Sequence, residues 1–258
     1  MSLNKNKYQP LVSIITVVFN GEQHLKQTIN SVLHQTYSNI EYIIIDGGST
    51  DGTIDIIKEF EDDISYWISE SDNGLYDAMN KGIKLAKGEL IGMINSDDWY
   101  ELDAVETVVK AASDYPQKNI FHADRYDVKS IDDKRLYKFN PSKFKFKFYA
   151  MTYNHPTMFM KKIEYDNHLY NSSLTVLADY QFILEAYLRS PESIYYIERP
   201  IVNYRLSGVS SRMSMKCMLS EGFIARKKAG LNLAENIFAL AVRFCARILI
   251  DIRNYFKG

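Results

Sequence analysis

The most constraining feature of this sequence is residues 90–99, where an apolar run ends in paired acidic residues. Such a run is typical of a parallel sheet, whose strands are covered on both faces. Ligands of open α/β sheets bind beyond the carboxyl ends of the strands. Asp97 and Asp98 follow this run, and adjacent carboxylates are costly without a cation or proton between them. The stretch predicts either an Mg²⁺ or Mn²⁺ site that bridges to phosphates, or a polar loop that caps a helix.

Apolar and amphipathic segments alternate through the first half of the chain. The segments with strand character are residues 11–19, 40–45, 64–68 and 90–95, and those with helical spacing are 22–35, 53–60, 75–86 and 103–115. This alternation predicts right-handed βαβ units and a mostly parallel central sheet flanked by helices.

The pattern changes after residue 120. We expect a hairpin from residues 120–128 and 135–139, an exposed or groove-lining strand at 143–149, a strand at 157–160, a helix at 178–189, a strand at 194–202, and helices beyond 216. In the segment 143–149 Lys alternates with aromatic residues, which is typical of an exposed strand or of a segment that lines a groove.

Composition excludes several classes of protein. The length of 258 residues suits one large α/β domain, or one domain with an appendage. A net charge of -1 gives no support to a nucleic-acid-binding surface. Cys217 and Cys245 lie too far from other cysteines for a disulfide scaffold, which favours a reducing, cytoplasmic compartment. No apolar run reaches the roughly 18 residues of a membrane span, and the first ten residues lack the apolar core of a signal peptide.

Polar clusters follow three of the predicted strands. Asn20 and Gly21 follow the first, Asp46 and a glycine-rich turn follow the second, and the Asp97–Asp98 pair follows the strand at 90–95. Because the carboxyl ends of parallel strands share one edge of the sheet, these clusters are expected to converge. The glycine-rich turn has neither the G-x-G-x-x-G spacing nor a Walker lysine.

Four segments carry a resemblance to a known family. They read P-L-V-S-I-I-T-V-V-F-N at residues 10–20, I-I-I-D-G-G-S-T-D-G-T at 43–53, S-E-S-D-N-G-L-Y-D-A-M-N-K-G at 69–82 and N-S-D-D-W at 95–99. In this order and spacing they resemble family 2 glycosyltransferases of the GT-A fold, strongly to residue 99 and weakly to about residue 211. The resemblance implies an inverting, metal-dependent enzyme of the hexosyltransferase type that uses a nucleotide diphosphate sugar.

The resemblance implies roles for residues of the donor half. Val18, Asn20 and Glu22 are expected to border the base, Asp46 to contact the base or ribose, Asp72 to border the nucleotide and donor sugar, and Lys81 to approach a phosphate. For Lys81 the alternative is an ordinary surface lysine. Asp97 matches the metal-binding acid of the family's D-x-D motif, with Asp98 beside it. Asn95 stands at the first Asp of that motif, and with Ser96 it is a candidate for binding the ribose.

The acceptor half contributes fewer matches. Asp179 stands where the family places its catalytic base, although Ala178 replaces the usual Glu before it. An inverting displacement needs one carboxylate to take the acceptor proton. The alternative for Asp179 is a helix cap. His155 is either an acceptor-side or diphosphate contact, or a structural residue. Arg205 begins a Ser- and Gly-containing loop that resembles one closing over the diphosphate in relatives.

The last predicted helix, residues 236–256, has a wide apolar face, a narrow polar stripe and cationic flanks. Such a helix suits a membrane interface. The alternative is packing on the catalytic domain or on a second subunit in a homodimer.

Together these patterns predict a catalytic domain at residues 1–215 and a helical extension at 216–258. The catalytic domain divides into a nucleotide-sugar half, 10–100, and an acceptor half, 101–215. We expect a cytoplasmic glycosyltransferase, peripheral at the inner face of the cell membrane, that extends a lipid-linked glycan in polysaccharide assembly. The alternatives are a non-catalytic nucleotide-sugar-binding protein and a metal-dependent nucleotidyltransferase.

Overall fold

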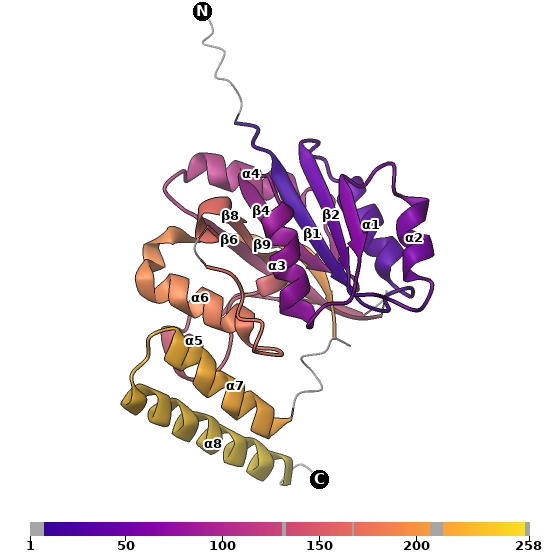
Figure 1. Ribbon diagram of the computed structural model, residues 1–258. Helices are drawn as coiled ribbons and strands as arrows, with labels where there is room; N and C mark the ends of the chain where they lie inside the picture. Colours follow the sequence, from indigo (N-terminus) through magenta and orange to yellow (C-terminus); the bar gives the residue numbers. More distant parts are fainter. Residues whose placement is uncertain (1–7, 131–132, 167, 207–213, 256–258) are drawn as a thin grey trace, which may run out of the picture.

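The computed structural model describes residues 8–130, 133–166, 168–206 and 214–255, the last helix beyond residue 246 by its backbone alone (Figure 1). The strands are β1 (Val12–Val18), β2 (Ile40–Asp46), β3 (Tyr66–Ser69), β4 (Leu90–Asn95), β5 (Trp99–Tyr100), β6 (Ile120–Ser130), β7 (Asp133–Tyr137), β8 (Phe159–Lys161) and β9 (Ile194–Arg205). The helices are α1 (Leu25–Leu33), α2 (Thr53–Glu59), α3 (Leu75–Leu85), α4 (Ala104–Asp114), α5 (Lys143–Phe148), α6 (Ala178–Arg189), α7 (Met215–Lys228) and α8 (Leu233–Tyr255).

The strands form one sheet in the order β3-β2-β1-β4-β8-β6-β9-β5, with β7 paired to β6. The first four strands of this order are parallel. Val18 pairs with Asp46, and Val17 pairs with Asn95, so β1, β2 and β4 end level with one another. Beyond β4 the sheet is mixed, because β8 runs antiparallel to both β4 and β6, whereas β6 and β9 form a long parallel ladder. This arrangement positions three polar strand ends at one edge.

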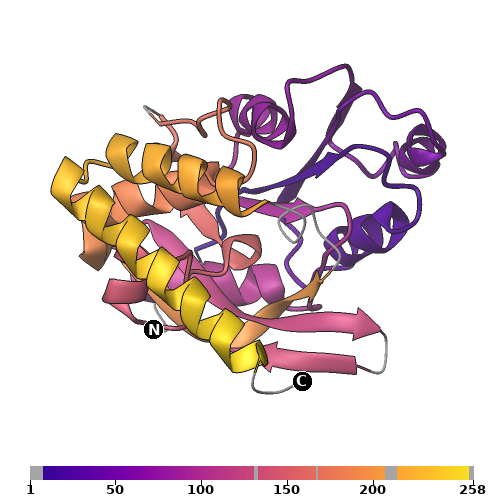
Figure 2. The ribbon, with the colours of Figure 1, turned by 90° about the horizontal axis from the view of Figure 1, so that it is seen from below.

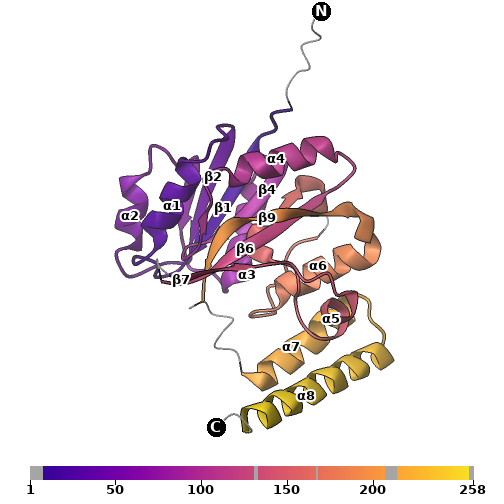
Figure 3. The same cartoon turned by 180° about the vertical axis from the view of Figure 1, so that it is seen from behind.

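The helices cover both faces of the sheet and create two cores. Successive strand residues point to opposite faces. Ile15 and Val17 of β1 belong to the core under α3 and α6, whereas Val12 and Ile14 belong to the core under α1, α2 and α4. Figures 1 and 3 show these two helical layers from the front and from behind. The continuous apolar runs of the sequence therefore reflect burial of both faces.

The expected strand at residues 143–149 is wrong, because this segment forms helix α5. The hydroxyl of Ser142 accepts a hydrogen bond from the backbone N–H of Lys145 and caps the helix. Phe146 is fully buried, whereas Phe144 and Phe148 lie four residues apart and contact Phe238 of α8. In the helix, Phe146 is buried in the core while Phe144 and Phe148 pack against α8. These tertiary contacts outweigh the preference of the alternating sequence pattern for a strand.

Other boundaries shift by a few residues. The first helix begins at Leu25 rather than at 22, and a 3₁₀ turn, His155–Thr157, precedes β8. The ring of Phe159 in β8 lies over Gly92 of β4, where an added Cβ would be 2.5 Å from that ring. Turn residue 132 of the expected hairpin, and residues 207–211 of the loop after Arg205, lie outside the described residues.

Helices α7 and α8 form a pair beneath α5 and α6 (Figure 2). Ala225 and Ala229 of α7 belong to the same core as α6. Helix α7 therefore packs against the acceptor half, and the predicted domain boundary at residue 215 stays a prediction. None of the described helices is long and apolar enough to cross a membrane.

Candidate active site

Two loops are tied together at the carboxyl ends of β1 and β2. Asn20 adopts a positive φ of 50°, and its side-chain oxygen accepts a hydrogen bond from the backbone N–H of Thr50 at 2.9 Å. The carboxylate of Glu22 accepts from the N–H of Gly52 at 2.6 Å. Val18 is buried, and its carbonyl accepts from the N–H of Gly47. The structure thus brings Val18, Asn20 and Glu22 to the expected edge, where the latter two side chains also brace the glycine-rich turn.

Asp46 organises that turn from within. Its side chain is fully buried, and Oδ2 accepts from the N–H groups of Gly48 and Ser49 and from the Ser69 hydroxyl. Oδ1 accepts from the Ser49 hydroxyl at 2.5 Å. Four donors occupy the acceptor capacity of one carboxylate. Asp46 therefore shapes the glycine-rich turn, and its expected contact with the base or ribose stays a prediction.

Asp72 lies directly over the glycine-rich turn. A Cβ added to Gly47 would be 2.5 Å from Oδ2 of Asp72, so only glycine leaves room for this carboxylate. Oδ1 of Asp72 accepts from the N–H of Gly74, which has a φ of 102°. The segment before α3 therefore meets the glycine-rich turn after β2, and the expected contact of Asp72 with the nucleotide and donor sugar stays a prediction.

Lys81 does not face this edge as a free cation. Its ammonium pairs with Glu70 at 2.8 Å and with Asp77 at 3.8 Å, and it donates to the carbonyl of Ser71. The hydrogen bond to Glu70 raises the pKa of Lys81. These contacts support the alternative, in which Lys81 is a structural surface residue that holds the segment before α3.

The two acids after β4 point in different directions. Asp98 is 1% exposed, and its Oδ1 accepts from the backbone N–H of Arg205 at 2.9 Å. The amide of Asn95 lies 3.4 Å from Oδ2. Burial, followed by the charge of Asp97, holds the pKa of Asp98 well above its usual range. Asp98 therefore attaches β9 to the turn after β4, and its expected role as a metal ligand stays a prediction.

Asp97 is half-buried, whereas Asp98 beside it is buried. Burial raises the pKa of Asp97, while the charges of His24 and Arg205 oppose that shift. Ser96 lies between Asn95 and Asp97, and its carbonyl accepts from the hydroxyl of Thr28 in α1. Asn95 and Ser96 thus reach the same edge, with both side chains half-buried.

Arg205, at the end of β9, borders Asp97. Its Nε donates to the carbonyl of Asp97 at 2.8 Å, and its guanidinium also contacts the side-chain oxygen of Gln27. The same group stacks 4.8 Å from the ring centre of Trp99. Burial, followed by the charge of Arg205, lowers the pKa of His24. The guanidinium of Arg205 therefore lies beside Asp97, after the end of β4. A positive charge at this position suits a site for a diphosphate.

The donor set at this turn suits a metal that is shared with a substrate. Among the described residues, no group of three His, Cys, Asp or Glu side chains is arranged to hold a metal ion by itself. Mg²⁺ is commonly bound by one or two carboxylates together with substrate phosphates. Burial is the main cause of the elevated pKa of Asp97. Asp97 fits the single-carboxylate arrangement.

Asp179, in the first turn of α6, meets α3 across the acceptor side. Its Oδ1 lies 3.1 Å from the hydroxyl of Tyr76, and it also accepts from the N–H of Tyr180. The Tyr76 hydroxyl lies 2.5 Å from the carbonyl of Val176. Burial and the charge of Asp179 hold the pKa of Tyr76 well above its usual range, so this phenol keeps its proton. Among the described residues, Oδ2 of Asp179 has no hydrogen-bond donor.

His155 joins the same cluster. Since β8 runs antiparallel to β4, the turn that precedes β8 lies beside the last residues of β4. The Nε2 of His155 is 2.9 Å from the hydroxyl of Tyr170. Burial lowers the pKa of His155, and the charge of Asp179 opposes that shift. The fold therefore brings His155 and Asp179 together on the acceptor side. Because the imidazole of His155 is neutral, it can bind an acceptor or a diphosphate by a hydrogen bond but not by a charge.

Glu221 of α7 supports the loop that leads to Asp179. Its carboxylate accepts from the backbone N–H groups of Thr175, Val176 and Leu177 at 2.8 to 3.1 Å. Burial opposes ionisation of Glu221, but these donors outweigh it and lower its pKa. A residue from the expected extension thus holds the acceptor half in place.

Sequence reasoning missed three residues at this edge. Phe19 is 64% exposed although it directly follows a buried strand, and an aromatic residue before Asn20 was the available signal. His24 and Tyr76 carry no local signal, because their partners Asp97 and Asp179 are distant in sequence.

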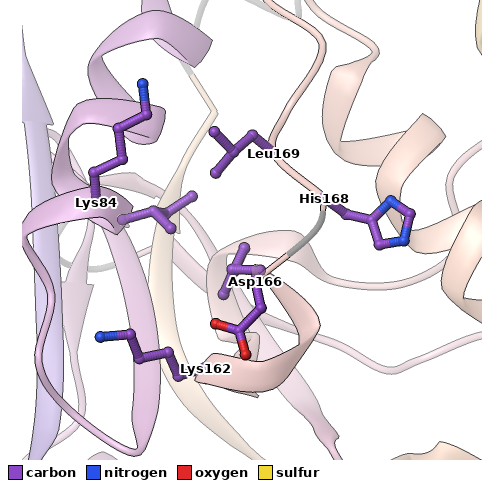
Figure 4. A pocket seen from close by; sticks show the side chains of 7 residues that line it. Lys84, Lys162, Asp166, His168 and Leu169 are labelled. Carbon is purple, nitrogen blue, oxygen red and sulfur yellow. The ribbon is translucent and has the colours of Figure 1, made fainter.

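A cavity of about 500 Å³ lies elsewhere, between α3 and the segment after β8 (Figure 4). Its lining includes Ile83, Lys84 and Lys162. These residues flank the end of α3 and the start of β4, at the opposite edge of the sheet from Asp97. In Figure 4 the side chains of Lys84, Lys162 and His168 do not converge on one point. The cavity is therefore not the candidate active site.

Comparisons with known proteins agree with this geometry. The model of Glycosyl transferase family 2 matches residues 13–169. An uncharacterized glycosyltransferase of Rickettsia typhi is 34% identical over 139 residues, which cover 54% of this chain and 43% of the relative. The putative glycosyltransferase EpsH of Bacillus subtilis is 39% identical over 107 residues, 41% of this chain and 31% of the relative. The chain thus spans less than half the length of these relatives.

Two solved structures share the fold. TarS of S. aureus in complex with UDP superposes with a TM-score of 0.67 at 16% identity, over 89% of this chain and 69% of that one. The mannosyltransferase PcManGT from Pyrobaculum calidifontis, in complex with GDP-Man and Mn²⁺, superposes with a TM-score of 0.59 at 15% identity, over 92% and 70% of the two chains.

Proposed function

Since this chain belongs to glycosyl transferase family 2 and has the GT-A fold expected from its sequence, we propose that it transfers a sugar from a nucleotide diphosphate sugar to an acceptor hydroxyl, with inversion at the anomeric carbon. The observation that carries this proposal is the convergence at one sheet edge. The ends of β1, β2 and β4 lie level there, and the turn with His155 lies beside the end of β4.

The donor is assigned to the β1–β2–β4 side. Phe19 offers an exposed aromatic face for a base, and Asp72 with the braced glycine-rich turn borders the nucleotide. Arg205 is assigned to the diphosphate, because a guanidinium beside Asp97 suits that anion. The solved relatives were determined with UDP, UDP-GlcNAc or GDP-Man, which supports a nucleotide diphosphate sugar of hexosyl type as the donor class.

Asp179 is assigned as the general base. In a single displacement, its carboxylate takes the proton of the acceptor hydroxyl while that oxygen bonds to the anomeric carbon and the nucleotide diphosphate leaves. No protein nucleophile is required. Tyr76 orients the carboxylate through Oδ1, so Oδ2 is left to accept the proton. His155, held by Tyr170, lines the acceptor side.

Asp97 would hold a divalent ion of the Mg²⁺ or Mn²⁺ class together with the donor diphosphate. Such an ion, when bound, stabilises negative charge on the leaving phosphates. The presence of Mn²⁺ in the PcManGT complex supports this assignment. Arg205 supplies the remaining positive charge at that turn.

The acceptor is proposed to be a lipid-linked glycan in polysaccharide assembly, with the enzyme acting in the cytoplasm. This part of the proposal rests on the family resemblance and on the apolar, cationic helix α8. A homodimer through the same helix is the alternative use of that surface.

The proposal is tested by incubating the protein with a panel of nucleotide diphosphate sugars and Mn²⁺ and measuring release of nucleotide diphosphate. We expect release from a subset of donors, and a loss of about 10²-fold or more in Asp97→Asn, because one metal ligand is removed. Glu59→Gln, a change of a surface acid paired with Lys26, is the control and should keep full activity. Full activity of Asp97→Asn in excess chelator would exclude the metal role.

The same assay separates the two alternatives. Donor binding by calorimetry with no release or transfer under any condition would identify a non-catalytic nucleotide-sugar-binding protein. Release of pyrophosphate from a nucleoside triphosphate and a sugar phosphate would identify a nucleotidyltransferase.

A further inference from the structure

Helix α8 carries an exposed apolar stripe. Leu233, Ile237 and Phe244 are 66%, 56% and 64% exposed. Their spacing of four and seven residues places them on one side of a helix with 3.6 residues per turn. Asn236, Ala239 and Arg243, on the opposite side, are buried. In Figure 2, α8 is the outermost element, seen from below with no described segment covering it.

Helix α5 extends this surface although it is distant in sequence. The ring of Phe144 lies 6.1 Å from that of Phe238, and the ring of Phe148 lies 5.2 Å from it. Lys147 of α5 pairs with Glu235 of α8 at 2.7 Å. Phe144 and Phe238 are themselves exposed. We call this surface the α5–α8 face; it consists of Lys143, Phe144, Lys145, Leu233, Ile237, Phe238 and Phe244.

The charge of the chain is distributed unevenly around this face. Residues 143–148 and 215–255 contain ten Lys and Arg but three Asp and Glu, whereas the rest of the chain contains 21 basic and 29 acidic residues. Lys143 and Lys145 are exposed on α5, and Lys216, Lys227 and Lys228 are exposed on α7. The acid nearest to α5, Glu235, is already paired with Lys147. Arg226 and Arg243 of these helices are buried, so among the described residues the positive charge at the border of the apolar stripe comes from Lys143 and Lys145 of α5.

We propose that the α5–α8 face docks on the surface of an anionic lipid bilayer, with α8 lying in the plane of the interface. Exposed Phe, Ile and Leu side chains enter the boundary between headgroups and acyl chains, and the lysines contact lipid phosphates. A second copy of the chain is a poorer occupant, because a two-fold contact would place each cationic rim against an identical one. The proposal does not depend on the transfer reaction.

The test is co-sedimentation of the full chain, without substrate, with vesicles of phosphatidylcholine alone or mixed with phosphatidylglycerol. We expect binding to the anionic vesicles and little binding to the neutral ones. Binding should weaken as salt rises, because the Debye length falls from about 8 Å at physiological ionic strength to about 3 Å at 1 M.

Matched variants locate the contact. Ile237→Asp and Phe244→Asp should each lower the partition coefficient about tenfold or more, because an inserted apolar group is replaced by a charge. Ile163→Asp is the control, since Ile163 is also 64% exposed but lies at the 3₁₀ turn after β8. Lys143→Gln and Lys145→Gln should each lower binding about fivefold. Lys87→Gln, at a side chain that is 81% exposed on the loop before β4, should change it little.

Three results would overturn the proposal. The first is an intact protein that ignores anionic vesicles. The second is an Ile163→Asp protein that loses as much binding as Phe244→Asp. The third is a dimer in sedimentation equilibrium that Phe244→Asp dissociates while vesicle binding is absent, which would assign the face to a second copy. Circular dichroism of each variant checks that the fold is retained.

Discussion

The phenol oxygen of Tyr76 on α3 lies 3.1 Å from Oδ1 of Asp179 on α6, and this contact joins the two halves of the sheet edge. Tyr76 lies in the first turn of α3, whereas Asp179 lies in the first turn of α6. The Tyr76 proton is shared between the carboxylate and the carbonyl of Val176, so both the side chain and the loop before α6 are positioned by one hydroxyl.

Tyr76→Phe should lower turnover about tenfold while leaving the Michaelis constant for the donor nearly unchanged. The ring remains packed against Tyr170, but the hydrogen bond that orients Asp179 is lost. Steady-state kinetics at saturating acceptor measure both quantities. Tyr42→Phe is the control, because it also removes a buried hydroxyl, bonded to Thr16 at 3.0 Å, on the other face of the sheet. Equal losses in both variants would show that only stability is affected.

Asp179→Asn should lower turnover by about 10²–10⁴-fold with donor affinity preserved. The amide keeps the size of the side chain but cannot accept the acceptor proton. Transfer kinetics and calorimetry with the nucleotide diphosphate provide the two measurements. If donor affinity falls and turnover at saturation survives, Asp179 belongs to the donor site, and His155 becomes the next candidate for the base.

Asp46→Asn should weaken binding of the nucleotide diphosphate by about 1.5–3 kcal/mol through distortion of the glycine-rich turn, and should lower the free energy of unfolding as well. An amide NH₂ would face donors such as the N–H groups of Gly48 and Ser49. Ser69→Ala removes one donor to the same carboxylate and should have a smaller effect, of about 1 kcal/mol. Calorimetry and urea denaturation measure the two effects. Weaker binding without any loss of stability would favour a direct contact between Asp46 and the nucleotide.

The free energy of unfolding should decrease when the pH is lowered, because His122 is buried in its neutral form. This imidazole is 1% exposed among the rings of Phe139, Tyr153 and Tyr196, and burial lowers its pKa from 6.5 to about 3. Between those values the unfolded chain binds more protons than the folded one, so stability present above pH 6.5 is lost as pH falls toward 3. The shift corresponds to a loss of about 2 kcal/mol between pH 7 and pH 5.

Urea denaturation at pH 7 and at pH 5 measures this loss. His122→Phe keeps an aromatic ring in the cluster but removes the titrating group, so its stability should depend less on pH over the same interval. An unchanged pH dependence in His122→Phe would assign the loss to other groups, such as Glu221, whose pKa is lowered in the folded protein.

The sequence alone was sufficient for the first half of the fold. The strands that end at Val18, Asp46 and Asn95, and the helices between them, follow from local hydrophobic periodicity and from glycine at the turns. Parallel pairing then levels these ends at one edge, so the predicted convergence of the polar clusters needed no long-range information. The family, which rests on motifs within this half, was also correctly identified.

Tertiary structure decided the use of individual side chains. Asp97 and Asp98 are indistinguishable as neighbours in the sequence, yet Asp98 turns inward because the backbone of Arg205, 107 residues away, offers it a donor. Tyr76 and Asp179 are separated by 103 residues, and Glu221 meets the loop before α6 from 44 to 46 residues away. Residues 143–149 became a helix because Phe146 fills the core while Phe148 packs on α8. Local patterns specify where a strand or helix can form, but the partner of a buried polar or aromatic side chain depends on which distant segments the chain brings together.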